Sequence, residues 1–168
     1  MKNKILVTIV DKNDKIIGHK YRDSLSNNDI YRVSALWVVN KKGDILLAQR
    51  HHAKLHHPGK WGPAVAGTVE KGETYRQNII KETHEELGIK NIKPTVGPKT
   101  ETTGTWRHFT QWYLLQNNLA TDQFKIQKTE VQKIKWFSRD ELLTDLKTQP
   151  QKFLPTMKKY FKLFYARY

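Results

Sequence analysis

The chain has 168 residues, a formal net charge of +14 and no cysteine. This length suits one compact core and is short for two, so we expect a single domain over residues 1–168. The composition excludes a disulfide framework and a zinc–cysteine site. Because no run approaches the roughly 20 apolar residues of a membrane span or the apolar region of a signal peptide, we expect a cytoplasmic protein without a membrane partner.

Five strands are expected in the first 70 residues, because short runs of β-branched and aromatic residues alternate there with turn-forming segments. The first two runs pair as a hairpin around Asp11–Asp14, and the next two pair around Lys41–Asp44. A basic loop over residues 50–58 leads to the fifth run. The strands are predicted at residues 4–10, 15–21, 31–39, 45–49 and 64–69.

The second half adds strands and then helices. Strands are predicted at residues 93–102, 106–115 and 131–137. Ser138 is a suitable N-cap for the next helix, with Glu141 at the capping-box position. A last helix over residues 153–165 carries an apolar stripe that we expect to dock onto the core. The stripe comprises Leu154, Met157, Phe161, Tyr165 and Tyr168. Strands around an embedded helix, with further helices late in the chain, predict an α/β or α+β sandwich.

The most informative window is Gly67–Ile89, GTVEKGETYRQNIIKETHEELGI. At about 100° per residue, Glu82, Glu85 and Glu86 lie at roughly 0°, 300° and 40° around a helix, so their carboxylates share one side. Like charges at this spacing repel one another, and a bound cation would neutralise them. Oxygen ligands favour Mg²⁺ or Mn²⁺, and a glycine in the preceding loop lets a backbone carbonyl approach the same ion. The alternative is a solvated acidic face on a surface helix.

The same window resembles the signature of the Nudix hydrolases: glycine, five residues, Glu, seven residues, Arg-Glu, an apolar residue, any residue, Glu-Glu, any residue, glycine and an apolar residue. It departs at Lys81, where the pattern has arginine, and at Thr83, where the pattern has an aliphatic residue. The matching positions are Gly67, Glu73, Glu82, Glu85, Glu86, Gly88 and Ile89.

The resemblance implies an α/β/α sandwich with a mixed sheet, in which the signature forms a loop-helix-loop beside the sheet. It covers roughly residues 30–147. We therefore expect residues 1–29 to form an N-terminal hairpin extension, residues 30–147 the core, and residues 148–168 a C-terminal helix.

The resemblance also implies a Mg²⁺-dependent hydrolase, with Mn²⁺ as an alternative, that cleaves a diphosphate linkage in a nucleoside diphosphate derivative or a related organic diphosphate. The ion would neutralise phosphoryl charge and orient the attacking water. Glu82, Glu85 and Glu86 are the implied metal ligands, together with the carbonyl of Gly67. Glu82 is the first candidate for the general base, and Glu130 is the second.

Three further signature residues are expected to orient the loop and the helix: Glu73, Lys81 and Gly88. Glu73 is more suited to holding the loop than to binding the ion directly. Lys81 would pair with a carboxylate, but it lacks the bidentate fork of arginine.

Candidate substrate contacts flank the segments expected around the cleft, and for each of them an ordinary surface or core position is the alternative. The basic candidates are Arg50, Lys54, Lys60, Arg107 and His108. Aromatic candidates for stacking on a base are Trp61, Trp106 and Trp112, although strand alternation places some of them in the core. The histidine tract, comprising His51, His52, His56 and His57, is expected to be solvated rather than to bind zinc.

Two other functions remain open. Residues 31–89 look like the branch of the family that includes isopentenyl diphosphate isomerases. Those enzymes use an essential cysteine and a metal-binding histidine where this sequence has Ala66 and Thr68, so a hydrolase related to that branch is favoured. The second alternative is a noncatalytic RNA-binding or regulatory module, because the positive charge attracts anions at long range. A homodimer is also compatible with the sequence.

Overall fold

The computed structural model describes residues 5–165. Within that range the chain forms nine strands and three α-helices. The strands are β1 (Leu6–Val10), β2 (Ile16–Tyr21), β3 (Ile30–Val39), β4 (Ile45–Arg50), β5 (Trp61–Pro63), β6 (Val65–Thr68), β7 (Thr95–Thr102), β8 (Arg107–Gln116) and β9 (Val131–Phe137). The helices are α1 (Tyr75–Leu87), α2 (Arg139–Thr148) and α3 (Met157–Tyr165), and short 3₁₀ turns are η1 (Arg22–Ser24), η2 (Thr121–Gln123) and η3 (Pro150–Lys152).

Strand β3 organises the sheet, because four other strands pair with it. Strand β8 runs parallel to β3 along its whole length. On the other edge of β3, strands β1, β6 and β4 pair antiparallel with successive segments. Strand β2 extends the sheet beyond β1, β7 beyond β8, and both β5 and β9 beyond β4. The result is a mixed sheet, as predicted.

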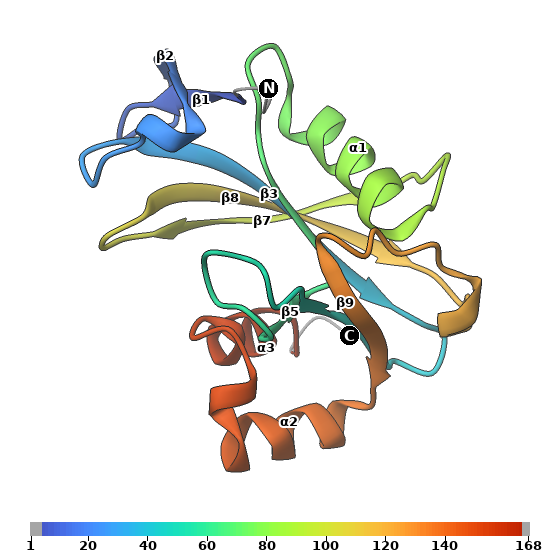
Figure 1. The fold of residues 1–168 in the computed structure, drawn as a ribbon. Helices are drawn as coiled ribbons and strands as arrows, with labels where there is room; N and C mark the ends of the chain where they lie inside the picture. Colours follow the sequence, from blue (N-terminus) through green and yellow to red (C-terminus); the bar gives the residue numbers. More distant parts are fainter. Residues whose placement is uncertain (1–4, 166–168) are drawn as a thin grey trace.

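The two faces of the sheet are buried against different helices. Alternation along β3 directs Trp37 to one face and Leu36 and Val38 to the other. Helix α1 covers the second face with Ile79 and Leu87, whereas α2 and α3 cover the first (Figure 1). This arrangement confirms the α+β sandwich with a mixed sheet.

The N-terminal hairpin of β1 and β2 joins the same sheet through β3. Its turn is fastened to the signature helix by Asp14, which has a φ of 61°. The Asp14 carboxylate accepts hydrogen bonds from Arg32 Nε at 2.7 Å and Tyr75 Oη at 3.1 Å. Lys4, expected in the first strand, lies outside the described residues. At the other end of the hairpin, η1 follows β2 and is held by a hydrogen bond from Arg22 N to the Ile5 carbonyl at 2.9 Å.

The last helix begins later than the sequence indicated, at Met157 rather than residue 153. Phe153 is extended and forms a bridge with Trp61, and Pro155 disfavours helical geometry in the residue before it. The helix therefore starts only after this proline.

Docking of α3 onto the core is confirmed, but its buried face differs from the predicted stripe. Met157 and Phe161 are buried as expected, together with Tyr160 and Phe164, whereas Tyr165 is 50% exposed. Tyr168 lies outside the described residues. No helix within residues 5–165 is long and apolar enough to cross a membrane.

Candidate functional site

The predicted signature helix is present as α1, and its two ends are well defined. Thr74 caps the N-terminus in a capping box with Gln77. Gly88 ends the helix in the left-handed conformation, with a φ of 71°, which glycine adopts without strain. Thr83 is fully buried and donates a hydrogen bond to the Ile79 carbonyl at 2.6 Å. This bond satisfies the hydroxyl, which explains how threonine occupies the aliphatic position of the signature.

Strand β6 and helix α1 approach each other closely at Gly67. A Cβ atom at position 67 would lie 2.6 Å from Oε1 of Glu82, which is closer than side-chain atoms can pack. Gly67 pairs with Ser34 of β3, so the sheet holds it in place. The glycine therefore lets the carboxylate of Glu82 lie directly against the strand.

Lys81 holds the loop that precedes the helix. Its ammonium lies 2.7 Å from Oε1 of Glu70 and 2.7 Å from Oε1 of Glu73. Burial opposes the charge of Lys81, but hydrogen bonds to Glu70 and Glu73 outweigh it and raise the pKa of the ammonium. Lysine thus makes two ion pairs at the position where the signature has arginine.

Asn78 was not singled out in the sequence, yet it connects the signature residues. It is fully buried. Its amide group donates to Glu73 Oε2 at 2.8 Å, to the Thr68 carbonyl at 3.1 Å and to Glu82 Oε1 at 3.4 Å. Its Oδ1 accepts from the hydroxyl of Ser34. Asn78 lies at an unspecified position of the signature, so only its buried location identifies it.

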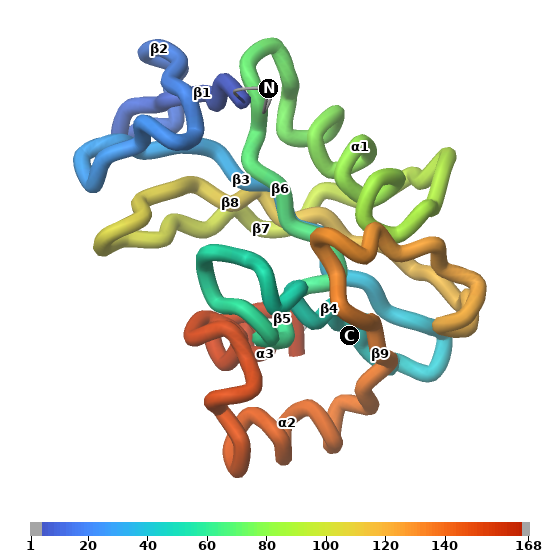
Figure 2. Tube along the Cα trace, viewed as in Figure 1, coloured from blue at the N-terminus to red at the C-terminus, as the bar shows by residue number. Residues whose placement is uncertain are grey.

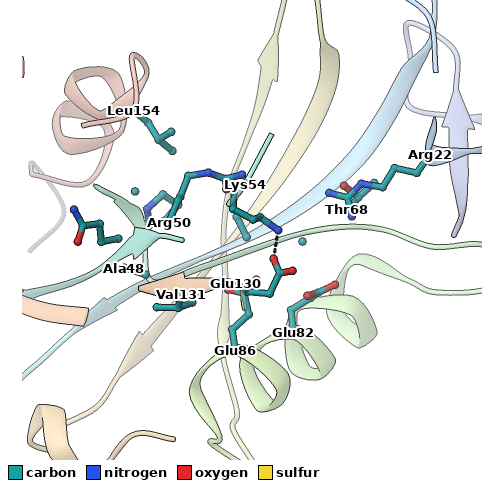
Figure 3. A pocket seen from close by; sticks show the side chains of 15 residues that line it. Arg22, Ala48, Arg50, Lys54, Thr68, Glu82, Glu86, Glu130, Val131 and Leu154 are labelled. Carbon is teal, nitrogen blue, oxygen red and sulfur yellow. Dashed lines mark hydrogen bonds and ion pairs between the residues drawn. The ribbon is translucent and has the colours of Figure 1, made fainter. Parts of the chain in front are cut away.

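A pocket of about 110 Å³ opens where these elements meet. Its lining divides into an acidic side and a basic side, seen in Figure 3. The acidic residues are Glu82, Glu86 and Glu130, and the basic residues are Arg22, Arg50 and Lys54. The remaining lining residues are Ala48, Gln49, Gly62, Pro63, Ala66, Gly67, Thr68, Val131 and Leu154.

The acidic side carries excess negative charge. Burial raises the pKa of Glu86 to about 8, and the nearby charges of Glu82 and Glu130 add to this effect. Burial also raises the pKa of Glu82, and repulsion from Glu85 and Glu73 contributes while Lys81 opposes it. The local electrostatics therefore favour either a proton or a cation beside these carboxylates.

Glu130 reaches the pocket from a distant part of the chain. The segment before it is fastened to the end of α1 by hydrogen bonds from Lys125 N to the Leu87 carbonyl and from Gln127 N to the Glu86 carbonyl, each 3.0 Å. The Glu130 carboxylate forms an ion pair with Lys54 of the β4–β5 loop. This pair joins the acidic and basic sides.

Several predicted residues lie outside the pocket lining. Glu85 is exposed on α1, although its charge acts on Glu82. Lys60 donates to the Gln151 carbonyl, and Arg107 begins β8. Trp61 is only 8% exposed and packs against Phe137, so it is not open to a stacking ligand.

The two other aromatic candidates differ in exposure: Trp112 is fully buried, whereas Trp106 is 41% exposed.

Arg22 lines the pocket but was not predicted, because η1 carries no local signal of function. It comes from the segment that follows the N-terminal hairpin.

Within residues 5–165, no three His, Cys, Asp or Glu side chains are already arranged to hold a metal ion, and this includes the histidine tract. The donor chemistry of the pocket nevertheless fits a divalent cation. Glu82 and Glu86 supply oxygen ligands, and the pKa of Glu86 is raised by burial and by neighbouring carboxylates that a cation would neutralise.

Comparison with known proteins gives a consistent family assignment. Residues 30–157 match the family model of the NUDIX domain. The isopentenyl-diphosphate Delta-isomerase of Salmonella arizonae is 25% identical over 165 residues, covering 90% of this chain and 86% of the relative. Its counterpart in Salmonella heidelberg is 26% identical, with 90% and 87% coverage.

Solved structures share the fold. A protein of Deinococcus radiodurans superposes with a TM-score of 0.78 at 19% identity, covering 94% of this chain and 97% of that one. A MutT protein of Methanosarcina mazei gives a TM-score of 0.67 at 18% identity, with 82% and 94% coverage. An Ap4A hydrolase of C. elegans gives 0.58 at 21% identity, with 81% and 96% coverage.

Proposed function

Because the chain belongs to the NUDIX domain family of pyrophosphohydrolases, we propose that it is a Mg²⁺-dependent hydrolase that cleaves the diphosphate linkage of a nucleoside diphosphate derivative or a related organic diphosphate. The observation that carries the proposal is the two-sided pocket, in which three carboxylates face two arginines and a lysine. A diphosphate is negatively charged, so it would be attracted both to the basic side and to a cation held on the acidic side.

Glu82 and Glu86, with the carbonyl of Gly67, would hold the ion. Glu85 is proposed as a further ligand on the signature alone, since its side chain is exposed. When bound, Mg²⁺ supplies neutralisation of charge on the phosphoryl oxygens. Lys81, Glu73 and Asn78 position the Glu82 carboxylate, because they join it to the loop and to the sheet.

Arg22, Arg50 and Lys54 are proposed to bind phosphoryl oxygens, and the planar guanidinium groups suit bidentate contact. Glu82 accepts a proton from the attacking water at its carboxylate oxygen. The water oxygen forms a bond to phosphorus, and the bond from phosphorus to the bridging oxygen breaks. Burial raises the pKa of Glu82, which makes its carboxylate a better proton acceptor than an exposed glutamate.

The isomerase relatives suggest a second reaction, but the pocket does not support it. Ala66 and Thr68 line the pocket at the positions that hold the cysteine and the histidine in the isomerase resemblance. Ala66 has no group that could transfer a proton to carbon, Thr68 lacks the imidazole that binds metal there, and the chain has no cysteine elsewhere to replace the thiol.

A substrate panel tests the proposal. Purified protein is assayed with Mg²⁺ against nucleoside diphosphate derivatives, capped RNA and prenyl diphosphates, and the same panel is repeated with Glu86→Gln. We expect Mg²⁺-dependent cleavage of a diphosphate that this variant loses. Conversion of isopentenyl to dimethylallyl diphosphate would instead establish the isomerase, and tight RNA binding without any turnover would establish the noncatalytic module.

A further inference from the structure

The segment that connects β2 to β3, residues 22–29, passes over the strand that separates them, and we call it the crossover. Strand β1 lies between β2 and β3 and runs antiparallel to both. Strands β2 and β3 are therefore parallel to each other, and the chain between them can be followed in Figure 2. Connections between parallel strands usually have about a dozen or more residues and often contain a helix. This one is shorter and contains only the 3₁₀ turn η1, so its path depends on other contacts.

Asp29, at the end of the crossover, makes those contacts. It is only 8% exposed. Lys20 Nζ, on β2, donates to Oδ1 at 2.7 Å and to Oδ2 at 2.9 Å. Ser26 donates to Oδ2 from its backbone N and from its hydroxyl, each at 2.8 Å. Because Lys20 and Ser26 lie on the two sides of Arg22 in the sequence, the Asp29 carboxylate closes the crossover around that arginine.

The Asp29 carboxylate is kept in its charged form. Burial opposes its ionisation, but the hydrogen bonds from Lys20 and Ser26 outweigh this effect and lower the pKa of Asp29. A charged group is costly to bury unless it is paired and hydrogen-bonded. The crossover therefore keeps one conformation, in which both Lys20 and Ser26 bind the carboxylate.

Arg22, at the start of the crossover, is positioned by its backbone. Its N donates to the Ile5 carbonyl at 2.9 Å, and its side chain extends to the pocket (Figure 3). Within residues 5–165, no hydrogen bond or ion pair holds its guanidinium. Burial lowers the pKa of Arg50, and the charge of Arg22 adds to this effect, so the two arginines repel each other. The backbone of the crossover must therefore hold Arg22 at the basic side of the pocket.

We infer that Asp29 is a positioning residue for diphosphate binding, because it clamps the crossover and so presents the Arg22 guanidinium to the pocket against repulsion from Arg50. This inference rests on the proposed diphosphate hydrolysis. Asp29 does not line the pocket itself, so it acts only through Arg22. Removing the Asp29 carboxylate should therefore weaken diphosphate binding only in a protein that still has Arg22.

A double-mutant cycle tests whether the two residues act as a unit. Calorimetry measures the binding of inorganic pyrophosphate, with Mg²⁺ present, to the wild type, Arg22→Ala, Asp29→Ala and the double variant. We expect each single variant to bind about tenfold more weakly, because hydrogen bonds between charged groups are the strong ones. The double variant should bind within about twofold of Arg22→Ala alone.

Lys20→Met is a milder variant, because the side chain of Lys20 is 47% exposed and its loss leaves no unpaired charge except that of Asp29. We expect about threefold weaker pyrophosphate binding, and no effect when Arg22 is already alanine. If Asp29→Ala does not fold, this variant completes the cycle. Lys135→Met is the matched control: Lys135 is 48% exposed, pairs with Glu141 and lies outside the pocket lining, so binding should not change.

Three results would overturn the inference. The wild type fails to bind pyrophosphate; or Asp29→Ala and Lys20→Met lower the melting temperature but leave pyrophosphate binding unchanged, so that Asp29 serves only the fold; or Asp29→Ala has an equal effect with and without Arg22. Turnover tests the proposed function separately. If pyrophosphate binding follows the cycle but no diphosphate of the substrate panel is cleaved, the hydrolase fails while the role of Asp29 stands.

Discussion

Gly67 and Glu82 lie in direct contact, and a Cβ atom at position 67 would lie 2.6 Å from Oε1 of Glu82. Gly67→Ala must therefore displace this carboxylate. We expect kcat to fall at least tenfold and the apparent affinity for Mg²⁺ to weaken. Gly18→Ala is the control, because a Cβ at that position meets nothing within 4 Å. Equal activity of the two variants would show that displacing the Glu82 carboxylate does not affect catalysis.

Lys81 pairs with both Glu70 and Glu73, so its role is to orient the loop. Lys81→Arg should preserve or raise kcat/KM, because a guanidinium can make the same two ion pairs. Lys81→Met should lower it, since Glu73 would lose its charged partner. A fall of about tenfold in the arginine variant, or about 1.4 kcal/mol of transition-state stabilisation, would contradict this role.

Asn78 is buried and joins Glu73, Glu82 and the Thr68 carbonyl. Asn78→Ala leaves these groups and the Ser34 hydroxyl without that partner, so we expect the free energy of unfolding to fall by about 1–3 kcal/mol. We also expect kcat to fall about tenfold with little change in KM, measured well below the melting temperature. Unchanged kcat in a destabilised variant would mean that Asn78 serves stability alone.

Glu86 gives the metal-free protein a predictable pH dependence. Its pKa is about 8 in the folded state, raised mainly by burial, and about 4.3 in an unfolded chain. The folded state therefore holds the proton more tightly. Protonated Glu86 therefore contributes to the stability of the folded state. This contribution is complete below about pH 4.3 and is lost as the pH rises through about 8.

Glu86→Gln removes this titration. Without metal, we expect the variant to be more stable than the wild type by the largest margin at pH 9, where the free energies of unfolding should differ by on the order of a few kcal/mol. At pH 5 the margin should be much smaller. Melting temperatures measured at the two pH values show both margins. Added Mg²⁺ should then stabilise the wild type more than the variant. A margin independent of pH would contradict the raised pKa.

The sequence predicted the parts of the site that depend on local spacing. The helix over Tyr75–Leu87, its glycine end and the shared side of Glu82 and Glu86 all follow from contiguous residues. These features form within one element and need no knowledge of how distant strands pair.

The rest of the site depends on contacts that local patterns do not encode. Glu130 reaches Lys54 across 76 positions, through a segment bonded to the end of α1. Arg22 enters the pocket only because the N-terminal hairpin joins β3. Trp106 is exposed because it lies just before β8 rather than within it, whereas Trp61 is buried in β5.

The central claim is that water attacks phosphorus in a diphosphate held between the glutamates and the basic side chains. It is tested most directly by running the reaction in water labelled with heavy oxygen and analysing the products by mass spectrometry. With Mg²⁺, we predict one labelled oxygen in a phosphate-containing product, and no product above background from Glu86→Gln. Products without label, or an isomerised substrate with its diphosphate intact, would contradict the account.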